Sequence, residues 1–263
     1  RPNAGRLMAL ARPLRYFESR AMVYRHTWRG SVITTFLNPI LYLAAMGVGL
    51  GTLVDDGAAL DGFSYLSFLA PGLLAATAMQ TAAGDASYPV MAGIKWTRTY
   101  EAALATPIGV RDLVRGHLTW VTARVAFTST VFAVVMAAFG AAPLWRSLLA
   151  VLPAILTGMA FAAPITAYTA KLKDPQGLAA MFRFGVIPMF LFSGTFFPVA
   201  QLPEIIQPIA YLTPLWHGVQ LCRAVALGIP TVTSPLISVA YLLAWFIIGS
   251  IVATRLLRSR MIS

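Results

Sequence analysis

Few side chains in this sequence could carry out catalysis, and they are scattered. The 263 residues include three histidines, one cysteine, and nine aspartates and glutamates. His26, His117 and His217 offer neither a metal-binding spacing nor a nucleophile paired with a base, so each is expected to be an ordinary hydrogen-bonded histidine. A single cysteine, Cys222, can form neither an internal disulfide nor a cysteine-based metal site, and a small buried apolar role is expected for it. We therefore expect no catalytic residues and no bound metal.

One glycine-rich run, MGVGLG at residues 46–51, invites comparison with a nucleotide-binding loop. Such a loop follows a strand and opens a helix, whereas this run lies near the end of a long apolar stretch. Gly47 and Gly51 are four residues apart, a spacing that favours close packing between helices over phosphate binding. The pattern G-x-x-x-x-G-K-[ST] occurs nowhere. If ATP powers this protein, a partner must hydrolyse it.

The composition indicates an integral membrane protein. The chain is 58% hydrophobic and 11% charged, with a mean hydropathy of +0.73, whereas about a quarter of the residues in a soluble domain are charged. A helix needs about 20 apolar residues to span a membrane. Six stretches are long enough, and together they predict an all-α domain of six transmembrane helices over residues 31–256. The six predicted spans lie near residues 31–53, 65–83, 118–140, 148–170, 178–197 and 235–256.

Basic residues set the expected orientation, because loops on the cytoplasmic side carry an excess of Lys and Arg. All of the 20 Lys and Arg residues except Arg146 and Arg223 fall on one side of the predicted membrane, while Asp55, Asp56 and Asp61 fall on the other. Both termini are therefore expected in the cytoplasm. The membrane topology thus explains the net charge of +11, so this charge is no longer an argument for nucleic-acid binding.

Three segments outside the spans have their own character. Residues 1–30 mix arginines with large apolar residues, which predicts an amphipathic helix lying along the cytoplasmic membrane surface. Residues 257–263 are expected to form a short cytoplasmic tail. The apolar segment 198–230 is interrupted by prolines, so it cannot form one continuous helix. We expect a pair of short helices there, meeting near residues 214–217 and dipping into the outer leaflet as a re-entrant hairpin.

Ionisable groups within the predicted spans are scarce. No Asp or Glu lies in the middle of one, which argues against a proton- or sodium-coupled transporter and against an intramembrane hydrolase. Arg124 and Arg183 lie one or two turns inside spans on the cytoplasmic side. They either extend to the interface or face a dimer cavity and attract an anionic lipid headgroup. Phe182 and Phe190 belong to an aromatic cluster in the fifth span, which suits either lipid-facing packing or an amphipathic substrate path.

The stretch KWTRTYEAALATP, residues 95–107, is a polar interruption between apolar runs. It predicts a helix over residues 95–105 that ends before Pro107, because the residue preceding a proline is disfavoured in a helix. Arg98 and Glu101 would stand near each other on one face. Three large apolar residues spaced four apart would share another face: Trp96, Tyr100 and Leu104. Such a helix either merely connects two spans or docks a soluble partner.

This order of elements resembles the membrane subunit of a type-2 ABC exporter. The segments RTYEAALATPIGVRDLVRGHLTW, YLSFLAPGLLAATAM and FSGTFFPVAQLPEIIQPIAYLTPLWHGVQLCRAVALG are similar to the branch that contains nodulation-type lipo-oligosaccharide exporters and daunorubicin-type drug exporters. The resemblance covers about residues 37–227. In the wider family a glycine often precedes the threonine of the 95–105 helix, whereas this sequence has Arg98, which fits the nodulation-like branch.

The resemblance implies a division of labour. Two permease subunits, expected to be identical copies, would form the pathway in a bacterial inner membrane, and two separate cytoplasmic ATPase subunits would bind ATP and Mg²⁺, so this chain would hold no cofactor. Residues 1–30 would be the connecting helix, and the hairpin would cap the outer mouth. The 95–105 segment would be the coupling helix that contacts the ATPase, through Lys95, Trp96, Arg98, Thr99, Tyr100, Glu101 and Leu104.

The expected cargo is an amphipathic lipid, a lipid-linked saccharide or a hydrophobic drug, moved outward and entering from the inner leaflet. The alternative is a membrane scaffold or channel-like component without a nucleotide-driven cycle. A membrane enzyme acting on lipids would need a cluster of polar catalytic groups at one depth, and the sequence supplies none.

Overall fold

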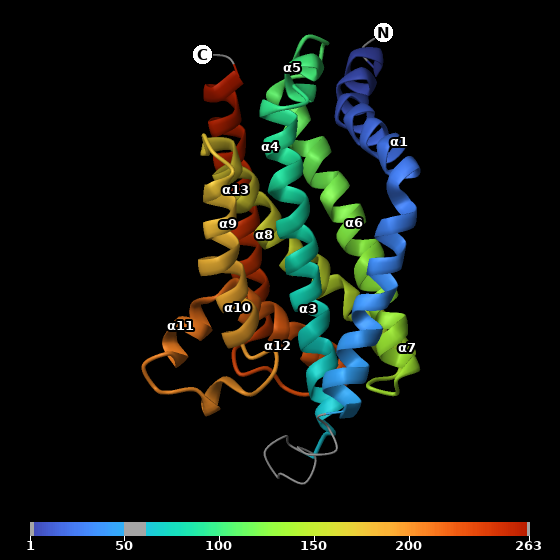
Figure 1. Cartoon of the computed structure of the whole chain (residues 1–263), viewed down its shortest axis with the longest axis vertical. Coiled ribbons are helices and arrows are strands. Elements are labelled where there is room, and N and C mark those ends of the chain that lie inside the picture. The colour runs from blue at the N-terminus through green and yellow to red at the C-terminus, as the bar shows by residue number, and fades with distance from the viewer. Residues whose placement is uncertain (1–2, 50–61, 262–263) are drawn as a thin grey trace.

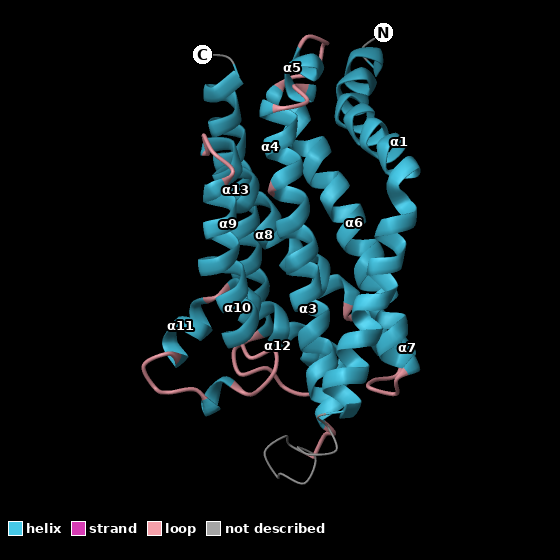
Figure 2. Cartoon of the chain, in the orientation of Figure 1, coloured by secondary structure: helices cyan, strands magenta, loops and turns pink. Residues whose placement is uncertain are grey.

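The computed structural model describes residues 3–49 and 62–261, and within these ranges the regular secondary structure consists of helices without strands (Figures 1 and 2). The predicted all-helical class is therefore confirmed. Gly51 and the three aspartates of the first predicted outer loop lie outside the described residues.

Four helical segments are long and apolar enough to cross a membrane: Tyr65–Lys95, Val110–Ala138, Leu144–Lys171 and Pro235–Met261. They coincide with the second, third, fourth and sixth predicted spans. Two shorter apolar segments, Thr35–Met46 and Gln176–Phe192, occupy the places of the first and fifth. The number of six spans remains a prediction.

The chain begins with a helix that is longer than expected. Helix α1, Asn3–Tyr42, is 40 residues long and continues into the π-helical turn η1, Leu43–Gly49. The predicted boundary at residue 30 is therefore not a helix end, although the ribbon of α1 changes direction along its length (Figure 1). A glycine such as Gly30 inside a helix costs only about 1 kcal/mol relative to alanine, so it need not end the helix.

The second span is interrupted near one end. Helix α3, Tyr65–Ala86, is followed after Ser87 by α4, Tyr88–Lys95. Pro89 lies in the first turn of α4, where a backbone N–H would have no acceptor within the helix, so its absence costs nothing. The Ser87 hydroxyl donates a hydrogen bond to the Gly84 carbonyl at 3.0 Å. The helical segment therefore extends well beyond residue 83, the predicted end of this span.

The centre of the bundle is α8, Val151–Lys171, which contacts α3, α6 (Val110–Ala138), α12 (Pro214–Leu227) and α13 (Pro235–Met261). Small residues permit this close packing. A Cβ atom at Gly249 of α13 would lie 2.6 Å from the ring of Pro164 in α8, so the two backbones approach as closely as they do only because Gly249 has no side chain.

The chain end that was predicted to be a tail is helical. Helix α13 continues to Met261, and Leu257 is buried. The Arg260 guanidinium donates hydrogen bonds to the carbonyls of Ala170 and Leu172 at 2.6 and 2.8 Å. These bonds fasten the end of α13 to the end of α8 and account for the extra helical turn.

The two ends of the bundle differ (Figure 1). The start of α1, the end of α13 and the short helix α5, Thr99–Leu104, lie at one end. Helices α7 (Leu144–Leu149), α11 (Gln207–Leu212) and α12 lie at the other. Helices α11 and α12 meet at Thr213, whose hydroxyl accepts the Trp216 N–H at 3.3 Å and caps α12. The dipping of this pair into a membrane remains a prediction.

The fifth predicted span consists of three short pieces: α9 (Gln176–Met181), the π-helical turn η2 (Phe182–Val186) and α10 (Ile187–Phe192). A 3₁₀ turn, η3 (Val199–Gln201), follows. Helix α10 has no buried residue in this single chain. Its side chains are therefore partly or largely exposed in the single protomer.

Candidate functional site

The segment predicted to be one helix over residues 95–105 is instead a turn followed by a short helix. Helix α4 ends at Lys95, because the N–H groups of Trp96 and Thr97 both donate to the Ala92 carbonyl, at 3.0 and 2.9 Å. Arg98 then adopts a left-handed backbone conformation, φ 48° and ψ 27°, and precedes α5. The expected alignment of Trp96, Tyr100 and Leu104 on one face is therefore wrong.

Tyr100 lies inside the molecule. It is 1% exposed and packs against the backbone of Gly93, where an added Cβ would lie 2.7 Å from the ring. Its ring also meets that of Tyr16 in α1 edge-on, with centroids 6.1 Å apart. Burial of an aromatic ring of this size contributes about 1.5–3 kcal/mol, which offsets the cost of about 1–2 kcal/mol for the left-handed backbone of Arg98. In this structure Tyr100 cannot contact a partner; it connects α5 to α1 and α4.

The rest of the predicted contact set divides between the surface and the fold. Trp96 is 58% exposed, and Arg98, Thr99 and Glu101 are also exposed. Lys95 donates a hydrogen bond from Nζ to the Lys173 carbonyl, which ties the turn to the loop after α8. Leu104 is partly buried against the core. We call the exposed group, Trp96, Arg98, Thr99 and Glu101, the α4–α5 turn surface.

Arg98 and Glu101 were expected to stand together. Among the described residues neither forms an ion pair, with the other or with a third side chain. Their charges are therefore available to a partner.

Two phenols beneath this surface stay uncharged. Burial raises the pKa of Tyr100 well above its ordinary value, and burial also raises the pKa of Tyr16, although Arg20 opposes the shift there. The contact between α1 and α5 is thus insensitive to pH in the neutral range.

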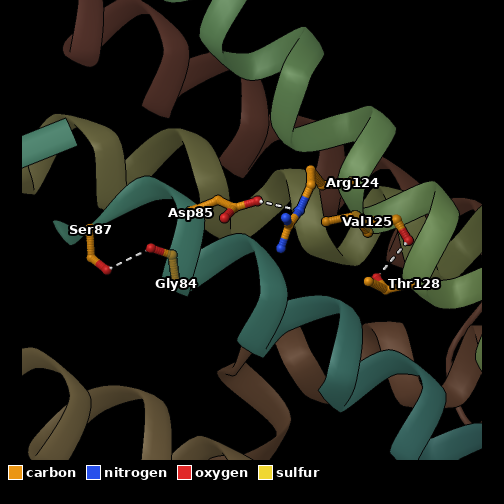
Figure 3. Close-up of polar contacts among 6 residues, drawn as sticks. All are labelled: Gly84, Asp85, Ser87, Arg124, Val125 and Thr128. Atoms are coloured by element: carbon orange, nitrogen blue, oxygen red, sulfur yellow. Dashed lines mark hydrogen bonds and ion pairs between the residues drawn. The ribbon is translucent and has the colours of Figure 1, made fainter. Parts of the chain in front are cut away.

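An ion pair joins α3 to α6, deeper in the bundle than the α4–α5 turn surface (Figure 3). Arg124 Nε lies 3.2 Å from Asp85 Oδ2, and the two side chains are 21% and 20% exposed. The Arg124 guanidinium also stacks over the ring of Tyr24 in α1, 4.7 Å from its centroid. Three helices therefore meet at this pair, which we call the α1–α3–α6 junction.

The ion pair changes the interpretation of Arg124. Its charge is balanced within the protomer by Asp85, so neither extension to the interface nor an exogenous anionic headgroup is needed to explain it. The sequence does not single out Asp85, because the second predicted span ends at residue 83. The sequence signal for this ion pair is that Asp85 and Arg124 lie near the ends of two neighbouring predicted spans, on the same side of the membrane.

The other substrate-path candidates have different surroundings. Arg183 is exposed on η2. Phe190 contacts Phe196 and Tyr42 edge-on, with centroids 5.0 and 6.4 Å away, and is partly buried within the protomer. Phe182 is also partly buried against the core. A role for these residues in a substrate path remains a prediction, as does helix packing through Gly47 and Gly51.

At the opposite end of the bundle, Arg223 occupies a cage of backbone carbonyls. The residue is 4% exposed, and its guanidinium lies over the ring of Phe68, 3.6 Å from the centroid. Nε donates to Phe68 O at 3.0 Å, and Nη2 donates to Gly194 O and Thr195 O at 2.7 and 3.1 Å. One side chain of α12 therefore holds both the start of α3 and the loop after α10.

The histidines follow the expectation only in part. His217 Nδ1 lies 3.0 Å from Ser238 Oγ, as expected for an ordinary hydrogen-bonded histidine. Both ring nitrogens of His117 are buried without a hydrogen-bond partner in the described structure. Within the described residues no group of three His, Cys, Asp or Glu side chains is placed to hold a metal ion.

Comparisons with known proteins agree on one family. The family model described as "ABC-2 type transporter" matches residues 19–227. The chain is similar to Nodulation protein J of Rhizobium meliloti (strain 1021), with 34% identity over 88% of this chain and 87% of the relative. It is similar at 33% identity to Nodulation protein J of Rhizobium leguminosarum bv. viciae, over 88% of each chain. Its identity to the inner membrane transport permease YadH of Escherichia coli (strain K12) is 24%, over 86% of this chain and 88% of the relative.

Proposed function

This chain belongs to the ABC-2 type transporter family, and from that premise we propose that it is the permease subunit of an ATP-driven exporter. The family and the apolar helices make it a multi-pass membrane permease. The finer proposal is that it moves an amphipathic substrate outward across a bacterial cytoplasmic membrane. Separate ATPase subunits, two per complex, would bind ATP and Mg²⁺, and two copies of this chain would form the pathway.

The observation that carries the proposal is the α4–α5 turn surface. It presents a largely exposed tryptophan and two unpaired charges at the end of the bundle where α1 begins and α13 ends (Figure 1). An exposed tryptophan flanked by charges is a typical anchor for a protein partner. The positive-inside rule predicts that this end is cytoplasmic, where an ATPase subunit would be found.

The contacts behind this surface provide a route into the bundle. Directly after the exposed turn, Tyr100 is wedged between Gly93 of α4 and Tyr16 of α1. Helix α1 is in turn fixed to α6 by ring contacts of Phe17 and Tyr24 with Trp120, each with centroids 5.6 Å apart. A displacement of α5 by an ATPase would therefore move α1 and α4 together, because packed side chains transmit strain.

The class of substrate is proposed from the surface of the fifth predicted span. Its large apolar side chains that are exposed are Phe184, Ile187, Leu191 and Phe192. Arg183 adds one exposed positive charge beside them. A path lined in this way suits a molecule with an apolar body and an anionic or polar head, such as a lipid, a lipid-linked saccharide or a hydrophobic drug.

Substitutions on the α4–α5 turn surface test the partner. Trp96→Asp and Glu101→Lys are each expected to weaken association with the ATPase about thirtyfold or more, the loss typical of an interface anchor. Transport should fall in parallel. Association is measured by co-purification and by titration of the purified ATPase onto the permease in nanodiscs.

Matched controls lie at the opposite end of the bundle. Trp145 is 59% exposed there, and Glu204 is exposed after η3, so Trp145→Asp and Glu204→Lys make the same chemical changes away from the proposed interface. Both control variants should bind the ATPase like the unmodified protein. Unchanged association in both turn variants would refute the proposed coupling role, and a purified complex without any nucleotide-binding chain would favour the scaffold or channel alternative.

A further inference from the structure

A cavity of about 550 Å³ lies between α6 and α13 and shares no residue with the sites described so far. We call it the arginine cavity. Its polar lining consists of three guanidinium groups and several hydroxyl groups, contributed mainly by Arg111, Arg115, Thr119, Ser250, Thr254 and Arg255. Its apolar lining includes Leu118, Met159, Phe246, Ile247 and Ile251.

The spacing of the lining residues explains how two helices form one cavity. On α6 they recur at residues 111, 114, 115, 118, 119 and 122, and on α13 at 246, 247, 250, 251, 254 and 255, so each helix contributes one face. Other residues of α6 serve a different neighbour: Gly116 meets Pro13 and Tyr16 of α1, and Trp120 meets Phe17. The cavity face of α6 is therefore distinct from the face that α1 covers.

The charged residues of the cavity lie at one end, and its apolar lining extends farther along both helices. Arg111 and Arg115 lie in the first two turns of α6 and Arg255 lies near the end of α13, so all three belong to the end of the bundle where α1 begins. The next turns carry hydroxyls, and the apolar residues Phe246 and Ile247 follow. At 1.5 Å per residue, Phe246 lies about 13 Å along α13 from Arg255.

The three positive charges have no counterion in the described structure. None of the three guanidinium groups forms an ion pair or a hydrogen bond there. Asp112 is the single acidic residue of α6, and its carboxylate accepts the Gly109 N–H at 3.2 Å, where it caps the helix. Helices α8 and α13 contain no acidic residue. Arginines clustered without carboxylates attract an anion, and guanidinium groups match the geometry of phosphate.

We propose that the arginine cavity binds an anionic glycerophospholipid, with its phosphate among Arg111, Arg115 and Arg255 and an acyl chain against the apolar lining. The lipid would come from the cytoplasmic leaflet in the orientation that the positive-inside rule predicts. Basic pockets between membrane helices on this side are suited to anionic headgroups. This inference does not rest on the transport function, because the site and its test need neither ATPase nor cargo.

The depth of the cavity favours a lipid over a free phosphate ion. A phosphate ion would occupy only the arginine end and would leave the lining by Leu118, Met159 and Phe246 unfilled. An acyl chain entering that space removes its apolar surface from water, which a free phosphate ion cannot do.

The test is a titration of the full-length protein with dioleoylphosphatidylglycerol, followed by native mass spectrometry. One lipid is expected to stay bound, and dioleoylphosphatidylcholine, which has no net charge, should bind at least tenfold more weakly. Each basic residue near a membrane surface contributes about a fivefold change in anionic lipid affinity. The double variant Arg115→Gln with Arg255→Gln should therefore weaken phosphatidylglycerol binding about thirtyfold.

Two further variants separate the cavity from general surface charge. The control variant Arg258→Gln with Lys173→Gln also removes two positive charges, from exposed residues that do not line the cavity. It should change the affinity for phosphatidylglycerol by less than about twofold. Ser250→Trp keeps every charge but fills the cavity, and it should weaken binding at least tenfold. Thermal unfolding of each variant checks that it is folded.

The proposal is overturned by any of three results. Both lipids could bind equally well, the control pair could weaken binding as much as the cavity pair, or millimolar inorganic phosphate could displace the lipid. The last result would identify a site for a free anion instead. If Ser250→Trp fails to fold, the comparison of the two charge pairs decides.

Discussion

Replacing Arg223 with methionine is expected to lower the free energy of unfolding by about 3–5 kcal/mol. Methionine keeps much of the apolar length of the side chain but removes the donors that satisfy the carbonyls of Phe68, Gly194 and Thr195. Each buried acceptor left without a donor costs about 1–3 kcal/mol. Removing the buried charge recovers part of this cost, so the net loss is smaller than three full penalties.

The measurement is thermal or denaturant unfolding in detergent micelles. The free energy of unfolding of Arg223→Lys should lie between those of the unmodified protein and Arg223→Met, because one ammonium group cannot reproduce the planar fork that spans three carbonyls. Arg258→Met is the control, since Arg258 is exposed on α13, and it should change the free energy by less than about 0.5 kcal/mol. An Arg223→Met variant as stable as this control would show that the carbonyl cage does not hold the loop after α10.

The second large effect is expected at the α1–α3–α6 junction. Arg124→Gln leaves the Asp85 carboxylate without its ion-pair partner, and Asp85→Asn likewise leaves the Arg124 guanidinium without its partner. Loss of one partner of a fully buried pair costs about 3–5 kcal/mol. Because both side chains are about one fifth exposed, water screens the orphaned charge, and we expect about 2 kcal/mol for each single substitution.

A double-mutant cycle isolates the interaction between the two side chains. The variant carrying both substitutions should be more stable than the sum of the single losses predicts, by about 1 kcal/mol or more, because no unpaired charge remains. Asp174→Asn provides a control for removing an acidic residue from an exposed loop. Strictly additive losses would mean that Asp85 and Arg124 do not interact energetically, and the junction would then rest on apolar packing alone.

Much of the fold follows from hydrophobic length. Four of the predicted spans coincide with long apolar helices, because a run of about 20 apolar residues leaves the backbone few alternatives. The ends of these helices were less predictable. Helix α13 extends to Met261 because Arg260 finds carbonyl acceptors on α8, and a contact between residues 90 positions apart leaves no mark on the local sequence.

The local geometry of the candidate segment differs from the sequence prediction, because residues 95–105 form a turn followed by α5 and not one helix. Helical periodicity placed Tyr100 beside Trp96, and periodicity assumes an unbroken helix. The structure breaks the helix because Tyr100 has a better place between Gly93 and Tyr16, a contact that brings distant α1 into the site. Tertiary packing outweighed local preference, which is the usual limit of a sequence pattern.

Asp85 shows a different limit. A carboxylate at the end of an apolar run is expected to mark the edge of a membrane span, since an unpaired charge is costly in the hydrocarbon. Pairing with Arg124 lowers that cost, and α3 continues past Asp85 to Ala86. A hydropathy scale assigns a value to each residue alone. It therefore does not take into account that the charge of one residue is neutralised by a residue of another helix.

The left-handed backbone of Arg98 has a consequence for which sequences this position can accept. Glycine adopts a positive φ without steric cost, and asparagine does so more readily than other residues with a side chain. Glycine is thus the least strained occupant of this backbone, whereas arginine adopts it at a conformational cost and supplies a charge. Among substitutions of Arg98, β-branched residues should therefore be tolerated least, because they adopt a positive φ least readily.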